Sequence, residues 1–232
     1  MLKIIEKIMD RLILPIPNFQ NYINNRYNRK GHTVIPINVL KKLYYENIGL
    51  RFISDEQLDT VYSINDYKFL DIKETDVVLD IGANIGAFSM IASKKAKHVY
   101  AIEPLFSDEI KDNISVNNIK NITVIESGLG SLGGGQWLSY GSKSKLVSLL
   151  PLLKIIELCG GHIDFLKCDC EGGEWIIKPD DLIGIRRIEA EIHCFNKEHE
   201  ISEFESILEI AGFKYETEIL SESTMIIHAC KL

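Results

Sequence analysis

The chain has 232 residues and a formal net charge of −7; 46% of its residues are hydrophobic and 25% are charged. This composition is typical of a globular protein with room for one large α/β domain. The acidic balance argues against a nucleic-acid surface as the main function, and five cysteines without a framework spacing indicate reduced thiols and a cytoplasmic protein.

The first 69 residues are expected to form a helical extension that acts as a lid over the domain that follows. Apolar residues from Leu2 to Leu12 share one helical face, and Pro15 ends that helix. We expect this helix to pack on the domain or on a second copy of the chain, as a homodimer, rather than on a membrane surface. No stretch reaches the about 18–20 uninterrupted apolar residues of a membrane span.

The region 70–232 alternates apolar runs with helical patterns and is expected to be the catalytic domain. A glycine-rich stretch at 128–144 predicts a loop or loose hairpin. The predicted strands are 77–81, 98–102, 122–125, 163–168 and 188–192, the helices are 85–95, 107–117, 147–159 and 201–211, and a closing hairpin spans 213–219 and 224–230. The order predicts an α/β fold, a doubly wound, mostly parallel, seven-stranded Rossmann-like sheet with an antiparallel C-terminal hairpin.

The segment from Val77 to Ser89 passes from a buried strand through a glycine turn into a helix. In such units the ligand lies at the carboxyl end of the strand, close to the helix N-terminus. Gly82 allows a tight turn and the close approach of a ligand, and Gly86 allows close contact between helix and strand. Asp80 is a carboxylate in an otherwise apolar strand, where we see no structural need for a charge.

Glu103 follows the second predicted strand directly, where a carboxylate can reach the ribose hydroxyls of a nucleoside held over the glycine turn. An NAD enzyme uses the same logic, but Gly82-x-x-x-Gly86 lacks the second early glycine that admits a pyrophosphate. A nucleoside ligand without phosphates fits better, and S-adenosylmethionine (SAM) is the common one. Asp80 then lies near the positively charged methionyl part.

Acidic and basic residues also gather at the ends of two later strands. Lys167, Asp169 and Glu171 share one strand face if the extended conformation continues, and they border the cofactor pocket. The next strand carries Glu189, Glu191 and His193 in the same alternation, and the last two fall at its end. Such a group is costly to bury unless its members pair, bind a metal or do chemistry. A buried Lys–Glu network that joins the two strand ends is the plain alternative.

These stretches carry a family resemblance. The run V-V-L-D-I-G-A-N-I-G at 77–86 resembles the first motif of class I SAM-dependent methyltransferases, and D-F-L-K-C-D-C-E-G-G-E at 164–174 resembles the D-x-x-K-x-D-x-E-G-x-E signature of the FkbM-like branch. The resemblance implies O-methylation of hydroxyl groups on sugars, polyketides or other small molecules. The cofactor contacts that it implies are Asp80, Gly82, Asn84, Gly86, Glu103 and Glu126.

A hydroxyl acceptor is a weak nucleophile, so a base or a metal is desirable. In one hypothesis His193 or Asp169 removes the proton. In the other, Asp169, Glu171 and Glu191 bind Mg²⁺, which lowers the pKa of the hydroxyl. The candidate catalytic residues are Asp169, Glu171, His193 and Lys167.

Two alternatives stay open at the level of sequence. An RNA or other nucleic-acid methyltransferase shares the opening motif, but the turn after Asp169 has no proline or aromatic residue on which a base would stack. A methyltransferase-like fold can also act as a non-catalytic SAM-binding module. SAM binding without turnover on hydroxylated metabolites would favour the module.

Overall fold

The computed structural model describes residues 49–53, 67, 71–131, 135–141, 143–195 and 198–231. The chain divides into two compact units, 1–65 and 66–232, and the fold described below is that of the second unit. The predicted N-terminal helix, with its dimer contact, lies outside the described residues. No helix in the described ranges is both long enough and apolar enough to cross a membrane.

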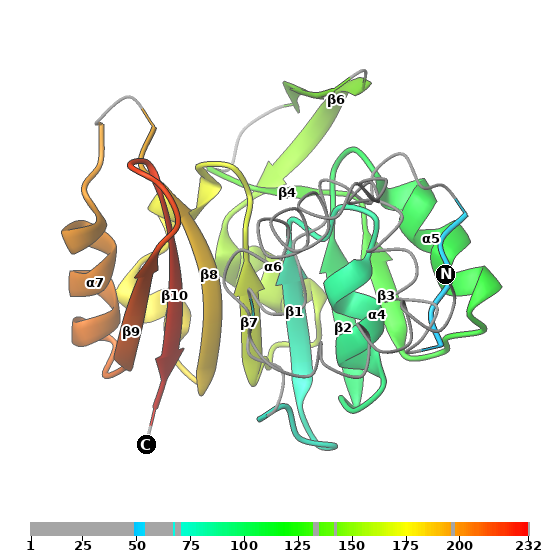
Figure 1. Cartoon of the computed structure of the whole chain (residues 1–232), viewed down its shortest axis with the longest axis horizontal. Helices are drawn as coiled ribbons and strands as arrows, with labels where there is room; N and C mark the ends of the chain where they lie inside the picture. The colour runs from blue at the N-terminus through cyan, green and yellow to red at the C-terminus, as the bar shows by residue number, and fades with distance from the viewer. Residues whose placement is uncertain are drawn as a thin grey trace, which may run out of the picture. The chain divides into compact units, whose positions relative to one another are not determined.

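The second unit is a layered α/β structure built around one large sheet (Figure 1). Its strands are β1 (Val77–Ile81), β2 (His98–Ile102), β3 (Ile122–Ile125), β4 (Gly128–Leu129), β5 (Gly135–Tyr140), β6 (Lys143–Leu150), β7 (Phe165–Cys168), β8 (Arg187–His193), β9 (Lys214–Ile219) and β10 (Thr224–Cys230). Its helices are α4 (Ala87–Ser93), α5 (Ser107–Val116), α6 (Leu152–Leu158) and α7 (Ile201–Ile210), with short 3₁₀ helices η1 (Gly173–Ile176) and η2 (Pro179–Leu182).

The large sheet has seven strands in the order β3-β2-β1-β7-β8-β10-β9. Strands β3, β2, β1, β7 and β8 run parallel, whereas β10 is antiparallel to both β8 and β9. The predicted fold class is therefore confirmed. From β1 the chain moves to β2 and β3 on one side, and it returns to β7 and β8 on the other. This reversal is the topological switch point of the sheet, and in such sheets ligands bind in a crevice at the carboxyl ends of the adjoining strands, here β1 and β7.

The central strand β1 is buried on both faces, as its apolar run predicts. Leu79 and Ile81 pack into one core cluster with Leu166, while Val78 packs into another with Phe88 on the opposite face. A parallel strand covered on both sides needs apolar residues at successive positions rather than alternate ones. The cores thus hold the end of β1 rigidly in place.

One predicted element is wrong, because 147–150 is part of a strand and not the first turn of a helix. Strand β6 runs from Lys143 to Leu150 and pairs antiparallel with β5, and helix α6 begins only at Leu152. Pro151 (φ −67°, ψ 156°) explains the break, since a residue before proline is disfavoured in the helical region. Of the two predictions for 128–144, a loop or a loose hairpin, the structure has the hairpin, formed by β5 and β6. The other predicted elements within the described residues differ from the structure by at most two residues at their ends.

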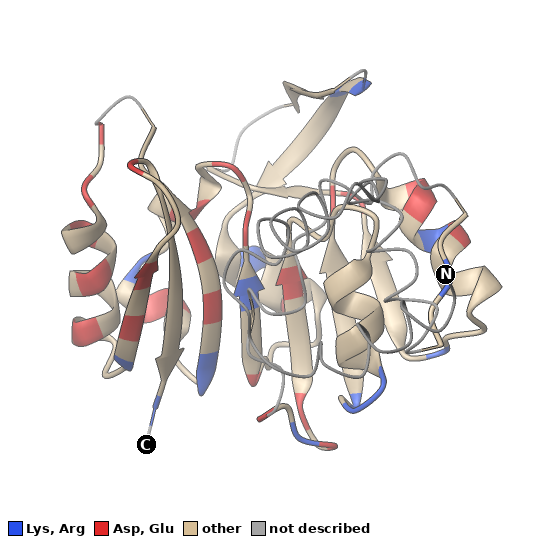
Figure 2. Cartoon of the chain, in the orientation of Figure 1, with Lys and Arg blue, Asp and Glu red and all other residues tan. Residues whose placement is uncertain are grey.

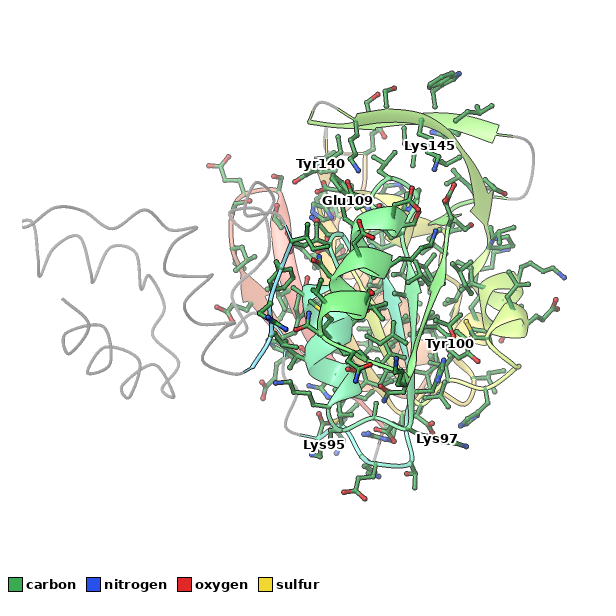
Figure 3. All side chains as sticks on the ribbon, turned by 90° about the vertical axis from the view of Figure 1, so that its right-hand side faces the viewer. Lys95, Lys97, Tyr100, Glu109, Tyr140 and Lys145 are labelled. Carbon is green, nitrogen blue, oxygen red and sulfur yellow. The ribbon has the colours of Figure 1, made fainter. Side chains whose placement is uncertain are left out.

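The β5–β6 hairpin reaches away from the large sheet and contacts the region around α5 (Figures 1 and 3). Lys145 Nζ lies 2.6 Å from Glu126 Oε1, and Lys143 pairs with Glu109. Figure 3 shows Glu109, Tyr140 and Lys145 at the same end of the domain. The hairpin therefore borders the crevice beside the end of β3, where Glu126 stands.

Candidate active site

The glycine turn between β1 and α4 lies directly against the end of β7. Gly82 (φ 73°) has no room for a side chain, because a Cβ there would fall 1.6 Å from the backbone oxygen of Asp169. Gly86 (φ 87°) would place a Cβ 3.0 Å from the side chain of Ile110 on α5. The tight turn predicted at Gly82 matches this geometry, whereas the close neighbour of Gly86 is helix α5 and not the strand that we expected. The turn brings its backbone to the edge of the Asp169 segment.

Glu103 is held at the same turn by backbone donors. Its Oε2 accepts a hydrogen bond from the Asn84 N–H (2.9 Å), and its Oε1 accepts from the N–H groups of Leu105 (2.8 Å) and Phe106 (3.2 Å). Burial raises the pKa of Glu103, and the three backbone donors oppose that rise. A carboxylate has about four lone-pair sites, so one stays available for a further donor such as a hydroxyl.

Asn84 provides a direct observation on whether a cofactor fits here. It adopts a left-handed conformation (φ 51°), and its buried Oδ1 accepts no hydrogen bond from any residue that the structure describes. A buried acceptor without a donor is costly, and a ligand N–H or O–H would satisfy it. Together with the remaining lone pair of Glu103 beside the Gly82 turn, it forms a cradle suited to a nucleoside.

Lys167 joins β1, the glycine turn and Asp169. Its Nζ donates to the Gly82 carbonyl (2.8 Å) and lies 3.2 Å from Asp80 Oδ1 and 3.7 Å from Asp169 Oδ2. Burial alone lowers the pKa of Lys167, but Asp80 and Asp169 outweigh it and raise that pKa above its ordinary value. Lys167 therefore stays cationic and does not act as a base.

Asp80 is fully buried and has partners inside the protein. Besides Lys167, it accepts a hydrogen bond from Ser89 Oγ on α4 (2.6 Å). The expectation that its charge has no structural use is wrong, because the carboxylate balances a buried ammonium. Its predicted position near the methionyl part of SAM stays a prediction.

Asp169, Glu191 and His193 come together where β7 and β8 end. One ligand-type atom of each side chain lies within 4.8 Å of the corresponding atoms of the other two. Asp169 also accepts a hydrogen bond from Tyr67 Oη at its Oδ2 (3.1 Å), and His193 Nε2 lies 3.3 Å from Glu191 Oε1. Two strand ends thus place three of the predicted groups in one cluster.

The surroundings shift two pKa values in this cluster. Burial raises the pKa of Asp169 to about 6, although Lys167 opposes the shift. Burial lowers the pKa of His193, but hydrogen bonds from its ring to Glu174 and Glu191 outweigh that effect and raise the pKa to about 10. Without further ligands, His193 is therefore an imidazolium at neutral pH and Asp169 is a carboxylate.

Glu174 is a residue of this site to which we assigned no role from the sequence. It is completely buried, and its Oε1 lies 2.6 Å from His193 Nδ1 and accepts the His193 backbone N–H (3.1 Å). Its Oε2 accepts the Gly172 N–H (2.7 Å). The sequence did contain one signal for Glu174, because it is the last residue of the motif D-F-L-K-C-D-C-E-G-G-E. For Tyr67, in the region read as an extension, the sequence offered none.

Glu171 does not take the position expected of it, and Glu189 lies back from the strand end, as its place in the alternation predicts. Strand β7 ends at Cys168, and Glu171 (φ 56°) turns away with a side chain that is 53% exposed, so the extended conformation does not continue as assumed. Glu189 is fully buried further back on β8, where it contacts Arg187 and His228. Figure 2 shows the acidic residues spread along β8.

Glu126, predicted near the adenine, faces the hairpin and α5. Its side chain accepts from Ser107 Oγ (2.9 Å) and from Lys145. The hydrogen bonds from Lys145 and Ser107 lower the pKa of Glu126. It borders the crevice, and its contact with a cofactor stays a prediction.

Comparison with known families adds an independent finding. The sequence at 80–215, more than half of the chain, matches the methyltransferase FkbM domain. The chain belongs to this family. FkbM membership confirms the resemblance inferred from the two motifs and supports SAM as the cofactor.

Individual relatives match this chain over shorter segments or at lower sequence identity. The chain is 42% identical over 92 residues to an uncharacterized protein of Methanocaldococcus jannaschii, which covers 37% of this chain and 32% of that protein. It is 24% identical over 163 residues to an uncharacterized RNA methyltransferase of Streptococcus mutans, which covers 63% of this chain and 36% of that protein. This FkbM-family chain thus spans about a third of the length of these curated relatives.

Solved structures share the fold at low sequence identity. A human methyltransferase 10 domain containing protein superposes with a TM-score of 0.50 at 13% identity, covering 84% of this chain and 96% of that one. An rRNA methylase from Streptococcus thermophilus also gives 0.50 at 13% identity, covering 69% of this chain and 89% of that one. At this identity the likeness concerns the fold alone.

Proposed function

We propose that the protein transfers a methyl group from SAM to a hydroxyl oxygen of a small molecule or sugar. The observation that carries the proposal is the contact between two halves of one site. The nucleoside cradle of Gly82, Asn84 and Glu103 lies against Asp169, whose carboxylate belongs to the cluster at the ends of β7 and β8. When bound, SAM supplies an electrophilic methyl group, and the protein has to align an acceptor oxygen with it.

The cradle residues have the tasks of binding and orienting the cofactor. Glu103 and the Asn84 Oδ1 offer acceptors to ribose or amino hydrogens, while Gly82 and Gly86 let the turn pack closely against Asp169 and Ile110. Lys167 holds the Gly82 carbonyl and the Asp169 carboxylate from one side. We therefore treat Lys167 as a positioning residue rather than as a group that moves a proton.

In the metal-free protein, Asp169 is the better base of the two candidates. Both ring nitrogens of His193 face carboxylates, Nδ1 toward Glu174 and Nε2 toward Glu191, so each holds a proton. Asp169 is ionised at neutral pH and lies beside the glycine turn. The acceptor proton then passes to Asp169, and the imidazolium stabilises the developing alkoxide. Turnover that is insensitive to EDTA would exclude a Mg²⁺-assisted alternative.

Titration calorimetry with SAM and S-adenosylhomocysteine tests the cofactor half of the proposal. We expect both to bind the wild-type chain and neither to bind a Gly82→Ala variant. Gly141→Ala is the matched control, because Gly141 also has a positive φ (58°) but a Cβ there would contact nothing within 4 Å. A folded wild-type protein that binds neither compound would overturn the proposal.

Methyl-labelled SAM tests the acceptor half. We expect label in hydroxylated metabolites of a cell extract, released as O-methyl ethers, and none in total RNA. RNA is a separate arm because a relative carries the name RNA methyltransferase. Label confined to RNA would replace a small acceptor with a nucleic acid, and SAM binding without any transfer would favour a non-catalytic module.

The thiols support a reducing compartment for this activity. All five cysteines are free, and Cys168 Sγ and Cys170 Sγ lie 3.7 Å apart without a bond. Disulfides are rare where glutathione keeps thiols reduced. We therefore propose a cytoplasmic enzyme, whose lid and dimer contacts would come from the N-terminal region.

A further inference from the structure

The cluster at the ends of β7 and β8 has a composition that suits a metal ion. Asp169 and Glu191 supply carboxylate oxygens and His193 supplies a ring nitrogen, with the three atoms within 4.8 Å of one another. Because β7 and β8 are parallel neighbours, their carboxyl ends present these ligands at one edge of the sheet. We infer that Asp169, Glu191 and His193 bind a divalent cation, with Glu174 orienting the histidine ring.

The orientation of His193 is an observation independent of those three side chains. Its Nδ1 lies 2.6 Å from Glu174 Oε1, so Nδ1–H points away from the cluster and Nε2 points into it. Glu174 is itself fixed by the Gly172 N–H on its other oxygen (2.7 Å) and is completely buried. A histidine that binds a metal commonly donates its second N–H to a carboxylate, which holds the ring in position.

The charges around the cluster also favour a cation. Glu171 Oε2 adds a further carboxylate 3.6 Å from His193 Nε2. The ammonium of Lys167 contacts Asp169 but is shared with Asp80 and the Gly82 carbonyl, and Tyr67 offers only a hydroxyl. A cation that joins buried carboxylates lowers the cost of burying their charges.

This ligand set differs from the Mg²⁺ set predicted from the sequence. His193 takes the place of Glu171, whose side chain is 53% exposed and is not one of the three clustered groups. Mg²⁺ prefers oxygen ligands, whereas an imidazole beside carboxylates suits Mn²⁺, Fe²⁺ or Zn²⁺. We therefore expect Mn²⁺ to bind more tightly than Mg²⁺, with release of the Nε2 proton.

The catalytic use of this cation rests on the proposed function, but its binding does not. In a methyltransferase the cation would hold the acceptor oxygen and lower the pKa of its hydroxyl. Asp169 would then act as a ligand rather than as the base of the metal-free protein. Binding is measured without an acceptor, so the two proposals fail separately: SAM binding without Mn²⁺ binding contradicts this inference alone, and Mn²⁺ binding without SAM binding contradicts only the methyltransferase proposal.

Electron paramagnetic resonance of free Mn²⁺ is a direct test on the full chain. We expect saturable binding of one Mn²⁺ per chain, lost in Asp169→Asn and in His193→Gln. Glu174→Gln should weaken binding by about 10- to 100-fold, the usual cost of removing such an orienting partner. His162→Ala is the matched control, because His162 Nε2 lies 3.0 Å from Asp164 Oδ1 in an exposed His–Asp pair that precedes β7.

Three results would overturn the inference. The first is the absence of saturable Mn²⁺ binding to folded wild-type protein. The second is unchanged affinity in the His193→Gln variant with loss in Glu171→Gln, which would assign the cation to carboxylates alone. The third is an equal loss in His162→Ala, which would indicate adventitious binding. Circular dichroism of each variant separates lost binding from lost folding, and Asp169→Asn, which keeps the side-chain shape, covers the case in which His193→Gln does not fold.

Discussion

Strand β8 carries two histidine–carboxylate groups with opposite characters. The closed group, defined as Arg187, Glu189 and His228, lies along the strand, and Glu189 Oε2 is 2.6 Å from His228 Nδ1 while Arg187 pairs with Glu189. The open group, defined as Asp169, Glu191 and His193, stands at its carboxyl end. Each group takes two of its residues from alternate positions of β8, but only the closed group, as defined, has an arginine among its members.

The neighbouring strands explain the difference. In the register of the sheet, Glu189 stands opposite His228 of β10 and Lys167 of β7. Glu191 stands opposite Ile226 on β10, and β7 has already ended at Cys168. The carboxylate of Glu189 therefore has a strand on either side, whereas Glu191 and His193 lie beyond the end of β7, although both of their side chains are buried. We expect the closed group to contribute to folding and the open group to bind ligands.

The largest expected effect comes from breaking the closed group. Arg187→Met leaves the Glu189 carboxylate buried without its guanidinium, so the free energy of unfolding should fall by about 3–5 kcal/mol. Urea denaturation measures the loss. SAM affinity of the fraction that stays folded should not change, and a fall in that affinity would mean that the two groups are coupled.

A change in the open group should lower activity rather than stability. Asp169→Asn is expected to lower the rate of methyl transfer by about 10²- to 10⁴-fold, because it removes a group that handles the acceptor proton. Its SAM affinity and its stability should stay close to those of the wild type. Glu189→Gln is the matched control, since it alters a buried carboxylate of the closed group and should change stability but not turnover per folded molecule.

A smaller effect is expected from Tyr67, which extends the open group beyond the sheet. Tyr67→Phe removes one hydrogen bond to Asp169 Oδ2, a change of about 0.5–1.5 kcal/mol, or roughly 2- to 13-fold in rate. The initial rate of label transfer from SAM measures it. The edge-on contact of the ring with Phe88 is retained, so unchanged turnover would mean that Tyr67 only packs.

The smallest effect concerns Glu103, a buried carboxylate whose partners are backbone N–H groups. Burial raises the pKa of Glu103 above its unfolded value, so its contribution to stability is present at low pH and is lost as the pH rises through the folded pKa. The stability of Glu103→Gln relative to wild type should therefore increase as the pH rises from below 4.5 toward neutrality. Urea midpoints at several pH values measure this, and a difference that shrinks with pH would contradict it.

Much of the fold was readable from local pattern. The apolar runs placed β1, β2, β3 and β10 at their observed bounds, because strands of a buried sheet need apolar residues whatever their neighbours are. The helix predicted to begin at 147 was wrong, since pairing with β5 and the conformation before Pro151 outweighed a helical apolar spacing. The spacing of apolar residues indicates which side chains are buried, but it does not indicate which element packs against them.

The sequence by itself determined the glycine turn, the acidic strand ends and the family, because each depends on residue types at short spacings. Only the tertiary structure separated Glu189 from Glu191, paired Lys167 with Asp80, and brought Glu174 and Tyr67 to the site. Those contacts depend on which strands are neighbours and where each one ends. A carboxylate becomes part of a core or of an active site according to whether an adjacent strand still covers it.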